Sequence, residues 1–144
     1  MTPQASQQIK TIEQWGGEIK KYLHQDLTDK IIGACFDIYN KLGYGYPEKV
    51  YQKALENELK KRKLSFKREL YGKILYDGDI VGKYYLDFLV EDKIAVEFKV
   101  RREIYESDWI QLLNYLKSEN LNVGLLIVFS KYELKIKRVI NNAD

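Results

Sequence analysis

Cysteine, histidine and proline are scarce in this chain of 144 residues, which holds one cysteine, one histidine and two prolines. Because Cys35 is the only cysteine, the chain can form no internal disulfide, and nothing indicates an oxidising compartment. Because His24 is the only histidine, a zinc site built from several histidines is excluded. Cys35 falls on the apolar side of a predicted helix, where we expect it to pack in the core.

Long apolar runs are also absent, since no run reaches the roughly 18 residues that a membrane span needs. The first ten residues, MTPQASQQIK, are polar and lack the apolar segment of a secretion signal. We therefore expect a cytoplasmic protein with no membrane association. No G-x-x-x-x-G-K-[ST] motif occurs, so this chain has no phosphate-binding loop of the P-loop type.

Charge of one sign is not in large excess: 24 lysines and arginines stand against 21 aspartates and glutamates, a net charge of +3. This small excess is weak support for an anionic partner, although a local basic patch can hide inside such a total. Tyrosine is abundant, with 12 residues. Because tyrosine serves core packing and base stacking equally well, composition alone identifies no partner.

The length suits one domain preceded by an extension. Residues 1–27 carry apolar residues at rough helical spacing, interrupted by Gly16-Gly17, and residues 28–144 form the predicted domain. We expect the extension to pack on the domain or to dock on a partner, either another protein or a second copy of the chain. Helices are predicted over 28–42 with Thr28 as N-cap, over 48–63, and over 108–119 with Ser107 or Asp108 as N-cap.

Strands are predicted over 65–71, 73–77, 80–90, 94–100, 122–130 and 131–139. Asp77-Gly78-Asp79 is a turn signal, so the strands on either side of it should form a hairpin. The segment NVGLLIVFS is a continuous apolar run, which is typical of a strand buried on both faces. The order of elements predicts an α/β fold with one central mixed sheet flanked by helices.

Two carboxylates are expected to meet on one face of this sheet. If residues 91–93 are the turn of a hairpin, the register places Asp87 directly opposite Glu97. Lys99 lies two residues beyond Glu97 and so shares its face. Neighbouring carboxylates repel each other unless a cation lies between them, and oxygen ligands favour Mg²⁺ or Mn²⁺. A lysine beside such an ion can orient an attacking water or offset charge on a phosphate.

The ordinary alternative stays open on spacing alone, because Glu-x-Lys on a strand is also common as a solvated cross-strand pair. Gln111 and Tyr115 lie four residues apart and therefore share one face of the helix that follows. Tyr115 is equally compatible with core packing. Gln111 lies among apolar neighbours, and we expect its amide to be buried and therefore to need polar partners.

The order of the motifs resembles that of a known family. Gly45-x-x-Glu48-x-x-Tyr51 is similar to the signature of the GxxExxY proteins, a branch of the PD-(D/E)XK nuclease superfamily. The likeness continues through LDFLV (86–90), AVEFKV (95–100), QLLNYL (111–116) and VGLLIVF (123–129). It covers about residues 28–139, with the motifs in order at the spacing expected of the family.

The resemblance implies a restriction-endonuclease-like fold with an αβββαβ core and an enzyme that depends on Mg²⁺ or Mn²⁺. By position, Asp87, Glu97 and the backbone carbonyl of Phe98 would bind the metal. Glu48 would complete the metal shell, directly or through water, and Lys99 would be the catalytic lysine.

The resemblance also assigns roles outside the metal shell. Gln111 and Tyr115 resemble the Q-x-x-x-Y element of RecB-type nucleases, which supports the site and contacts nucleic acid. Gly45 and Tyr51 would be structural, Gly45 in a turn and Tyr51 in the core. One departure bears on activity or substrate: Asp108 stands where relatives often have a histidine.

Four basic residues are the principal candidates for contacts with nucleic acid, within a wider set that also includes residues 60–63, Lys67, Arg68 and Lys137. Arg101 and Arg102 directly follow the strand of Glu97 and Lys99, which suits contacts to a phosphate backbone, and Lys131 and Lys135 are further candidates. A solvated charged face is the ordinary alternative for each of them.

The resulting interpretation is a metal-dependent nuclease that hydrolyses phosphodiester bonds, with DNA as the expected partner. The alternative is a catalytically silent module of the same fold that binds nucleic acid or a protein.

Overall fold

The computed structural model describes residues 23–142, so the predicted extension lies almost wholly outside the described part of the chain. The described elements are, in chain order, α3 (Gln25–Leu42), α4 (Glu48–Lys61), β1 (Phe66–Tyr76), β2 (Asp79–Val90), β3 (Ile94–Val100), α5 (Glu106–Ser118), β4 (Val123–Phe129) and β5 (Leu134–Ile140). Among these elements no helix has the length and apolar character that crossing a membrane requires.

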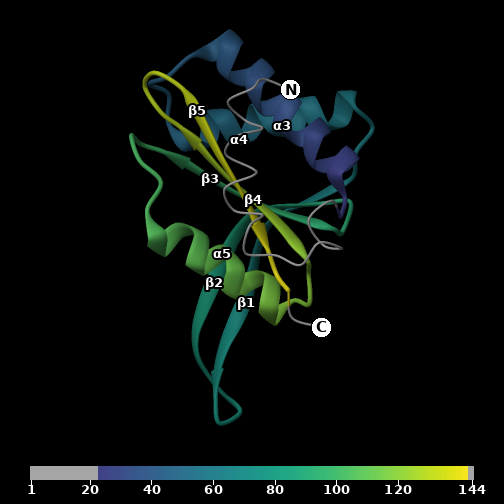
Figure 1. The fold of residues 1–144 in the computed structure, drawn as a ribbon, viewed down its shortest axis with the longest axis vertical. Helices are drawn as coiled ribbons and strands as arrows, with labels where there is room; N and C mark the ends of the chain where they lie inside the picture. Colours follow the sequence, from purple (N-terminus) through teal and green to yellow (C-terminus); the bar gives the residue numbers. More distant parts are fainter. Residues whose placement is uncertain (1–22, 143–144) are drawn as a thin grey trace.

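The strands form one mixed sheet in the order β1-β2-β3-β4-β5 (Figure 1). Neighbouring strands are antiparallel except β3 and β4, which are parallel and are joined through α5, as a parallel pair requires. Helices α3 and α4 cover one side of the sheet and α5 covers the other, while the β1–β2 hairpin extends beyond the helices (Figure 1). The predicted α/β fold, with a central mixed sheet flanked by helices, is confirmed.

The core has two apolar layers, one on each side of the sheet. The larger layer joins α3 and α4 to the sheet and includes Cys35, which is fully buried as expected. Every residue of β4 is buried, as predicted for a strand covered on both faces. Tyr51 is structural: its hydroxyl donates to the Gly43 carbonyl at 2.6 Å, and its ring stacks on Phe129 with the centroids 4.2 Å apart. Burial of each such large side chain contributes about 1.5–3 kcal/mol.

Both predictions of helix caps are wrong. Helix α3 begins at Gln25, and Thr28 lies inside it, where its hydroxyl donates to the Gln25 carbonyl at 3.1 Å and accepts from buried Arg138 at 2.8 Å. Helix α5 begins at Glu106 after Tyr105, and neither Ser107 nor Asp108 is its N-cap. Instead the Asp108 carboxylate, at the third helical position, accepts the Tyr105 backbone N–H at 3.1 Å.

Three strand and helix boundaries also differ from the predictions. The two strands predicted over 65–71 and 73–77 are one continuous strand, β1, which passes through Gly72. A Cβ at Gly72 would lie 3.0 Å from the Ser118 hydroxyl oxygen, so this glycine lets α5 approach β1 closely instead of ending the strand. Helix α4 ends at Lys61, two residues before its predicted end, and β5 begins at Leu134, three residues after its predicted start.

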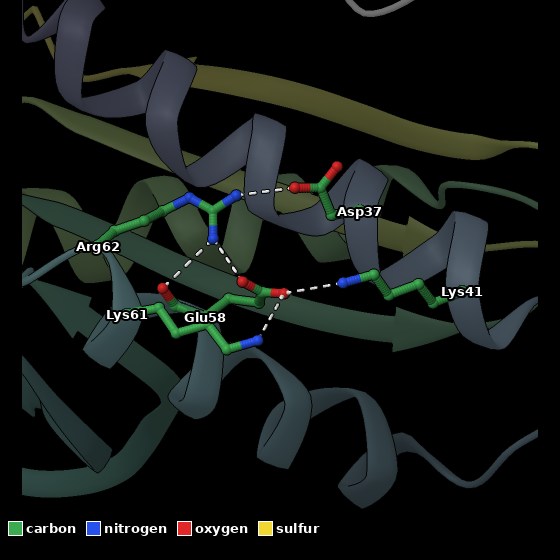
Figure 2. A network of polar contacts seen from close by, with 5 residues as sticks. All are labelled: Asp37, Lys41, Glu58, Lys61 and Arg62. Atoms are coloured by element: carbon green, nitrogen blue, oxygen red, sulfur yellow. Dashed lines mark hydrogen bonds and ion pairs between the residues drawn. The ribbon is translucent and has the colours of Figure 1, made fainter.

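A charged network joins α3 to α4 around Glu58, which is only 8% exposed (Figure 2). One carboxylate oxygen of Glu58 lies 2.5 Å from Arg62 Nη1, and the other lies 4.0 Å from Lys41 Nζ and 3.9 Å from Lys61 Nζ. Arg62 also reaches across to Asp37 at 2.9 Å. This buried carboxylate is therefore well supplied with positive charge.

Candidate functional site

The β2–β3 hairpin has the predicted register, with Val90 opposite Ile94. The ladder ends at the pair of Phe88 and Val96, so Asp87 and Glu97 are the next residues along, just beyond the last paired position. From there β2 continues into the β1–β2 hairpin and away from β3 (Figure 1). The two neighbouring strands therefore separate at the position of the two acids.

A strand irregularity opposite Asp87 accompanies the turning of its side chain toward β3. The β1–β2 ladder skips the position of Glu69, which has a left-handed φ of 55° and would otherwise lie opposite Asp87. Across Asp87 the buried side of β2 changes, because Leu86 packs in the layer under α5 whereas Phe88 packs in the layer under α3 and α4. The Asp87 carboxylate accepts the backbone N–H of Phe98 at 2.7 Å, in place of a ladder bond.

Glu97 and Glu48 complete a group of three carboxyls from β2, β3 and α4. Burial raises the pKa of Glu97, and a hydrogen bond to Asp87 and the nearby negative charges raise it further, while Lys99 acts in the opposite direction. Burial likewise raises the pKa of Glu48, with the Asp87 charge adding to it and Lys99 and Arg101 opposing. The structure thus brings the predicted Glu48, Asp87, Glu97 and Lys99 together, with more negative than positive charge among them.

A chain of hydrogen bonds connects Glu48 to Asp87 through Gln52, which was not among the expected site residues, and Arg68, which was expected only as a candidate phosphate contact. Gln52 donates to the Glu48 carboxylate at 3.2 Å and accepts from Arg68 at 3.0 Å. Arg68 Nε donates in turn to the Asp87 backbone carbonyl at 3.0 Å, and Arg68 Nη1 binds the Glu56 carboxylate at 2.9 Å. Gln52 could have been found from its spacing of four residues from Glu48, whereas Arg68 joins the group only through the tertiary fold.

Arg101 lies near Glu48 of the three carboxyls, and two neighbouring side chains hold its guanidinium. Its guanidinium forms an ion pair with Asp108 and lies 4.2 Å from the centroid of the Tyr105 ring. Asp108 is only 7% exposed and also accepts the Tyr105 backbone N–H. Asp108 therefore fixes a basic side chain next to the site.

The other three basic candidates gather at a separate hollow of about 330 Å³, whose lining includes Arg102, Lys131 and Lys135. Lys135 is already engaged: its ammonium donates to the Arg102 carbonyl at 2.7 Å and lies 3.2 Å from the Glu103 carboxylate. Lys131 lies 5.3 Å from the centroid of the Tyr132 ring. Nearby acceptors, including the Glu103 carboxylate, therefore largely compensate the charge of Lys135.

Gln111 and Tyr115 differ in their surroundings. Gln111 is exposed on α5, so the expectation of a buried amide is wrong. Only every third or fourth residue of this helix faces the sheet, and Gln111 is not one of them. Tyr115 is 4% exposed and packs in the apolar layer under α5, against Gly72 of β1. Burial, with the nearby Glu119 charge, raises the pKa of Tyr115 to about 12. Its packing alone accounts for its burial.

The chemistry of the three carboxyls fits a hard divalent ion. Within residues 23–142 no three acids, histidines or cysteines are arranged as a metal site, and the Asp87 carboxylate accepts the Phe98 backbone N–H. The donors nonetheless are all oxygens, and two of them share a hydrogen bond where a cation would separate them. Oxygen donors of this kind favour Mg²⁺ or Mn²⁺ over softer metals.

Comparisons with known proteins find a matching family and a similar fold. The model of the PD-(D/E)XK nuclease superfamily matches residues 25–139. The fold is similar to that of the crystal structure of SSO0001, with a TM-score of 0.52 and 17% sequence identity over 87% of this chain. This chain spans 62% of the length of that one. Among curated proteins no sequence matches significantly.

Proposed function

Because the chain belongs to the PD-(D/E)XK nuclease superfamily, we propose that it is a metal-dependent nuclease that hydrolyses phosphodiester bonds of DNA. One observation carries this proposal: Glu48, Asp87 and Glu97 converge from α4, β2 and β3 at the point where β2 leaves β3, with Lys99 beside them. A fold of this class can host many functions, so this group of side chains, and not the fold alone, supports the nuclease activity.

Asp87, Glu97 and the Phe98 carbonyl would hold one Mg²⁺ or Mn²⁺ ion, with Glu48 as a ligand directly or through water. Such an ion supplies an activated water and a charge that stabilises the pentavalent phosphorus. The Asp87 hydrogen bond to the Phe98 amide ties β2 to β3 and so keeps the donors of the two strands at a fixed separation. Lys99 places an ammonium beside the same carboxyls, where it can orient the water or offset charge on the phosphate.

Basic side chains around this group would hold the phosphate backbone. Arg101 is the best placed, because the Asp108 ion pair and the Tyr105 ring hold it within electrostatic reach of Glu48. Arg102, Lys131 and Lys135 would contact the polymer farther along, at their shared hollow. Gln111 and Tyr115 would support the site from α5, Gln111 through its exposed amide. These contacts go to phosphates and carry no sequence information by themselves.

The test is cleavage of labelled single- and double-stranded DNA and RNA in Mg²⁺, Mn²⁺ or EDTA. We expect wild-type protein to cut DNA only with a divalent ion, and Glu97→Gln to lose this activity. Glu58→Gln is the matched control, since Glu58 is another buried glutamate that lies in the network of Figure 2. Well-folded wild-type protein that neither cuts nor binds Mg²⁺ or Mn²⁺ by calorimetry would overturn the proposal and favour the catalytically silent module.

A further inference from the structure

Within residues 23–142, no helix or loop covers one side of the β1–β2 hairpin. Helix α5 packs against the side of Gly72 and Tyr84, since Ser118 and Tyr115 lie against Gly72 and Tyr84 belongs to the apolar layer under α5. The other side of the hairpin carries Tyr71 and Tyr85, which are 48% and 64% exposed, together with exposed Lys73 and Lys83. We call these four residues the tyrosine–lysine face.

The four residues form two cross-strand pairs. Tyr71 lies opposite Tyr85 with ring centroids 6.5 Å apart, and Lys73 lies opposite Lys83. Two directly opposed lysines disfavour the hairpin, because like charges repel across a strand pair. Neither lysine has an ion-pair partner within residues 23–142, and Lys83 Nζ lies instead 4.6 Å from the centroid of the Tyr71 ring. The face thus presents positive charge without compensation, next to two exposed rings.

A nucleic acid strand matches both properties of this surface. Aromatic rings that stack on successive bases, beside lysines that meet the phosphates, are the usual elements of surfaces for single-stranded nucleic acid. In a duplex the base faces are stacked on one another and are not available to tyrosine. The face therefore favours an unpaired strand over a duplex.

The position of the face agrees with such a strand entering the candidate site. Tyr85 lies on β2 only two residues before Asp87, which is about 7 Å along a strand. An adjoining hollow of about 790 Å³, lined in part by Tyr71 and Lys73 and by Lys117 and Glu119 of α5, leaves room for a base beside the hairpin.

We propose that the tyrosine–lysine face binds single-stranded nucleic acid next to the site of cleavage, with Tyr71 and Tyr85 stacking on bases and Lys73 and Lys83 contacting phosphates. The inference rests on the proposed function for the view that nucleic acid is the substrate. Binding can be measured without cutting, so the two can fail separately.

The test is fluorescence anisotropy with a labelled 12-nucleotide single strand and the matching duplex, in EDTA so that no cutting occurs. We expect the double variant Tyr71→Ala/Tyr85→Ala to bind the single strand at least about tenfold more weakly, with a smaller change for the duplex. Tyr71→Phe/Tyr85→Phe keeps the rings and should bind like wild type.

The lysines give a second, independent readout. In Lys73→Gln/Lys83→Gln the slope of log affinity against log salt should fall in magnitude by about 1.4, since each phosphate contact to a single strand contributes about 0.7. Melting temperatures of all variants should stay within a few degrees of wild type, because the four side chains are exposed and a cross-strand pair contributes only about 0.2–1 kcal/mol.

Three results would overturn this inference: wild-type protein that does not bind the single strand, double variants that bind it as wild type does, or variants that only dissociate a dimer in sedimentation. The last would make the face a contact between copies of the chain. Hairpin variants that lose binding, in a protein that cuts nothing with Mg²⁺ or Mn²⁺, would sustain the inference and count against the proposed nuclease activity alone.

Discussion

Helix α4 carries a glutamate in each of two charged groups, and the two groups differ in charge balance. Near the end of the helix, Glu58 is buried among Arg62, Lys41 and Lys61 (Figure 2). At its start, Glu48 lies with Asp87 and Glu97, where Lys99 and Arg101 oppose the three acids only in part. The first group is complete without any added ion, whereas the second has an excess of acids.

Burial of an acid therefore does not by itself indicate a functional site. Glu58 and Glu97 are almost equally buried, at 8% and 9% exposure. Only Glu97 lies against a second acid, the half-buried Asp87, and burial together with that neighbour raises the pKa of Glu97. A protein retains such an arrangement at a cost in stability, so the excess of acids points to a cation or a reaction that uses it.

The largest expected effect is on DNA cutting, which should depend on the lysine near Glu97 but not on a lysine near Glu58. Lys99→Met should lower the rate of metal-dependent DNA cutting by about 100-fold or more, because it removes the ammonium beside the scissile phosphate. Lys61→Met removes a lysine from the other group and should change the rate by less than about twofold. Single-turnover rates with excess protein measure both. Equal rates for Lys99→Met and wild type would remove Lys99 from the reaction.

Stability should separate the groups in the opposite sense. Glu58→Ala should lower the free energy of unfolding by about 1–2 kcal/mol, less than for a fully buried pair because Arg62 is 27% exposed. Glu97→Gln, measured in EDTA, should leave stability unchanged or raise it, because it removes a buried acid that lies against Asp87. Urea unfolding measures both variants. A large loss of stability in Glu97→Gln would mean that its carboxylate is structural.

A divalent ion should balance the excess of acids at Glu48, Asp87 and Glu97 and so stabilise the protein. Mg²⁺ or Mn²⁺ at ten times its dissociation constant stabilises by about 1.4 kcal/mol, which raises the melting temperature of a chain this long by about 3–6 °C. We expect this rise in wild type and in Glu58→Gln, and its loss in Asp87→Asn and Glu97→Gln. The melting temperature in EDTA serves as the baseline for each variant. A rise that persists in both site variants would place the ion elsewhere.

Sequence patterns predicted the order of the elements and the principal acids, because both depend on local periodicity and hairpin register. The turn at residues 91–93 alone is enough to bring Asp87 close to Glu97. The caps were not predicted, since Thr28 and Asp108 serve distant or unusual partners, Arg138 and the Tyr105 backbone. A side chain that bonds outside its own helix leaves no local signal.

The separation of β2 from β3 at Asp87, and the side chains that support it, also could not be predicted. Glu69 adopts a left-handed φ with no glycine or turn motif to announce it. Arg68 reaches from β1 to both α4 and β2, so its role depends on how three elements pack. The exposed position of Gln111 was missed for a related reason: apolar neighbours in sequence do not establish which side of a helix faces the sheet.

The smallest expected effect concerns Gln52, which we predict to be a positioning residue for Glu48. Gln52→Ala should raise the Mg²⁺ concentration for half-maximal cutting by about threefold to tenfold, because the Glu48 carboxylate loses its 3.2 Å hydrogen bond.

A merely structural role for Gln52 would act through Arg68, to which its amide oxygen is bound at 3.0 Å. Gln52→Glu separates the two roles, because a carboxylate keeps the acceptor for Arg68 but cannot donate to Glu48. If orientation of Glu48 matters, Gln52→Glu should melt like wild type yet need as much extra Mg²⁺ as Gln52→Ala. If Gln52→Glu instead restores the wild-type Mg²⁺ dependence, Gln52 acts only by holding Arg68, and the chain from α4 to β2 is part of the scaffold.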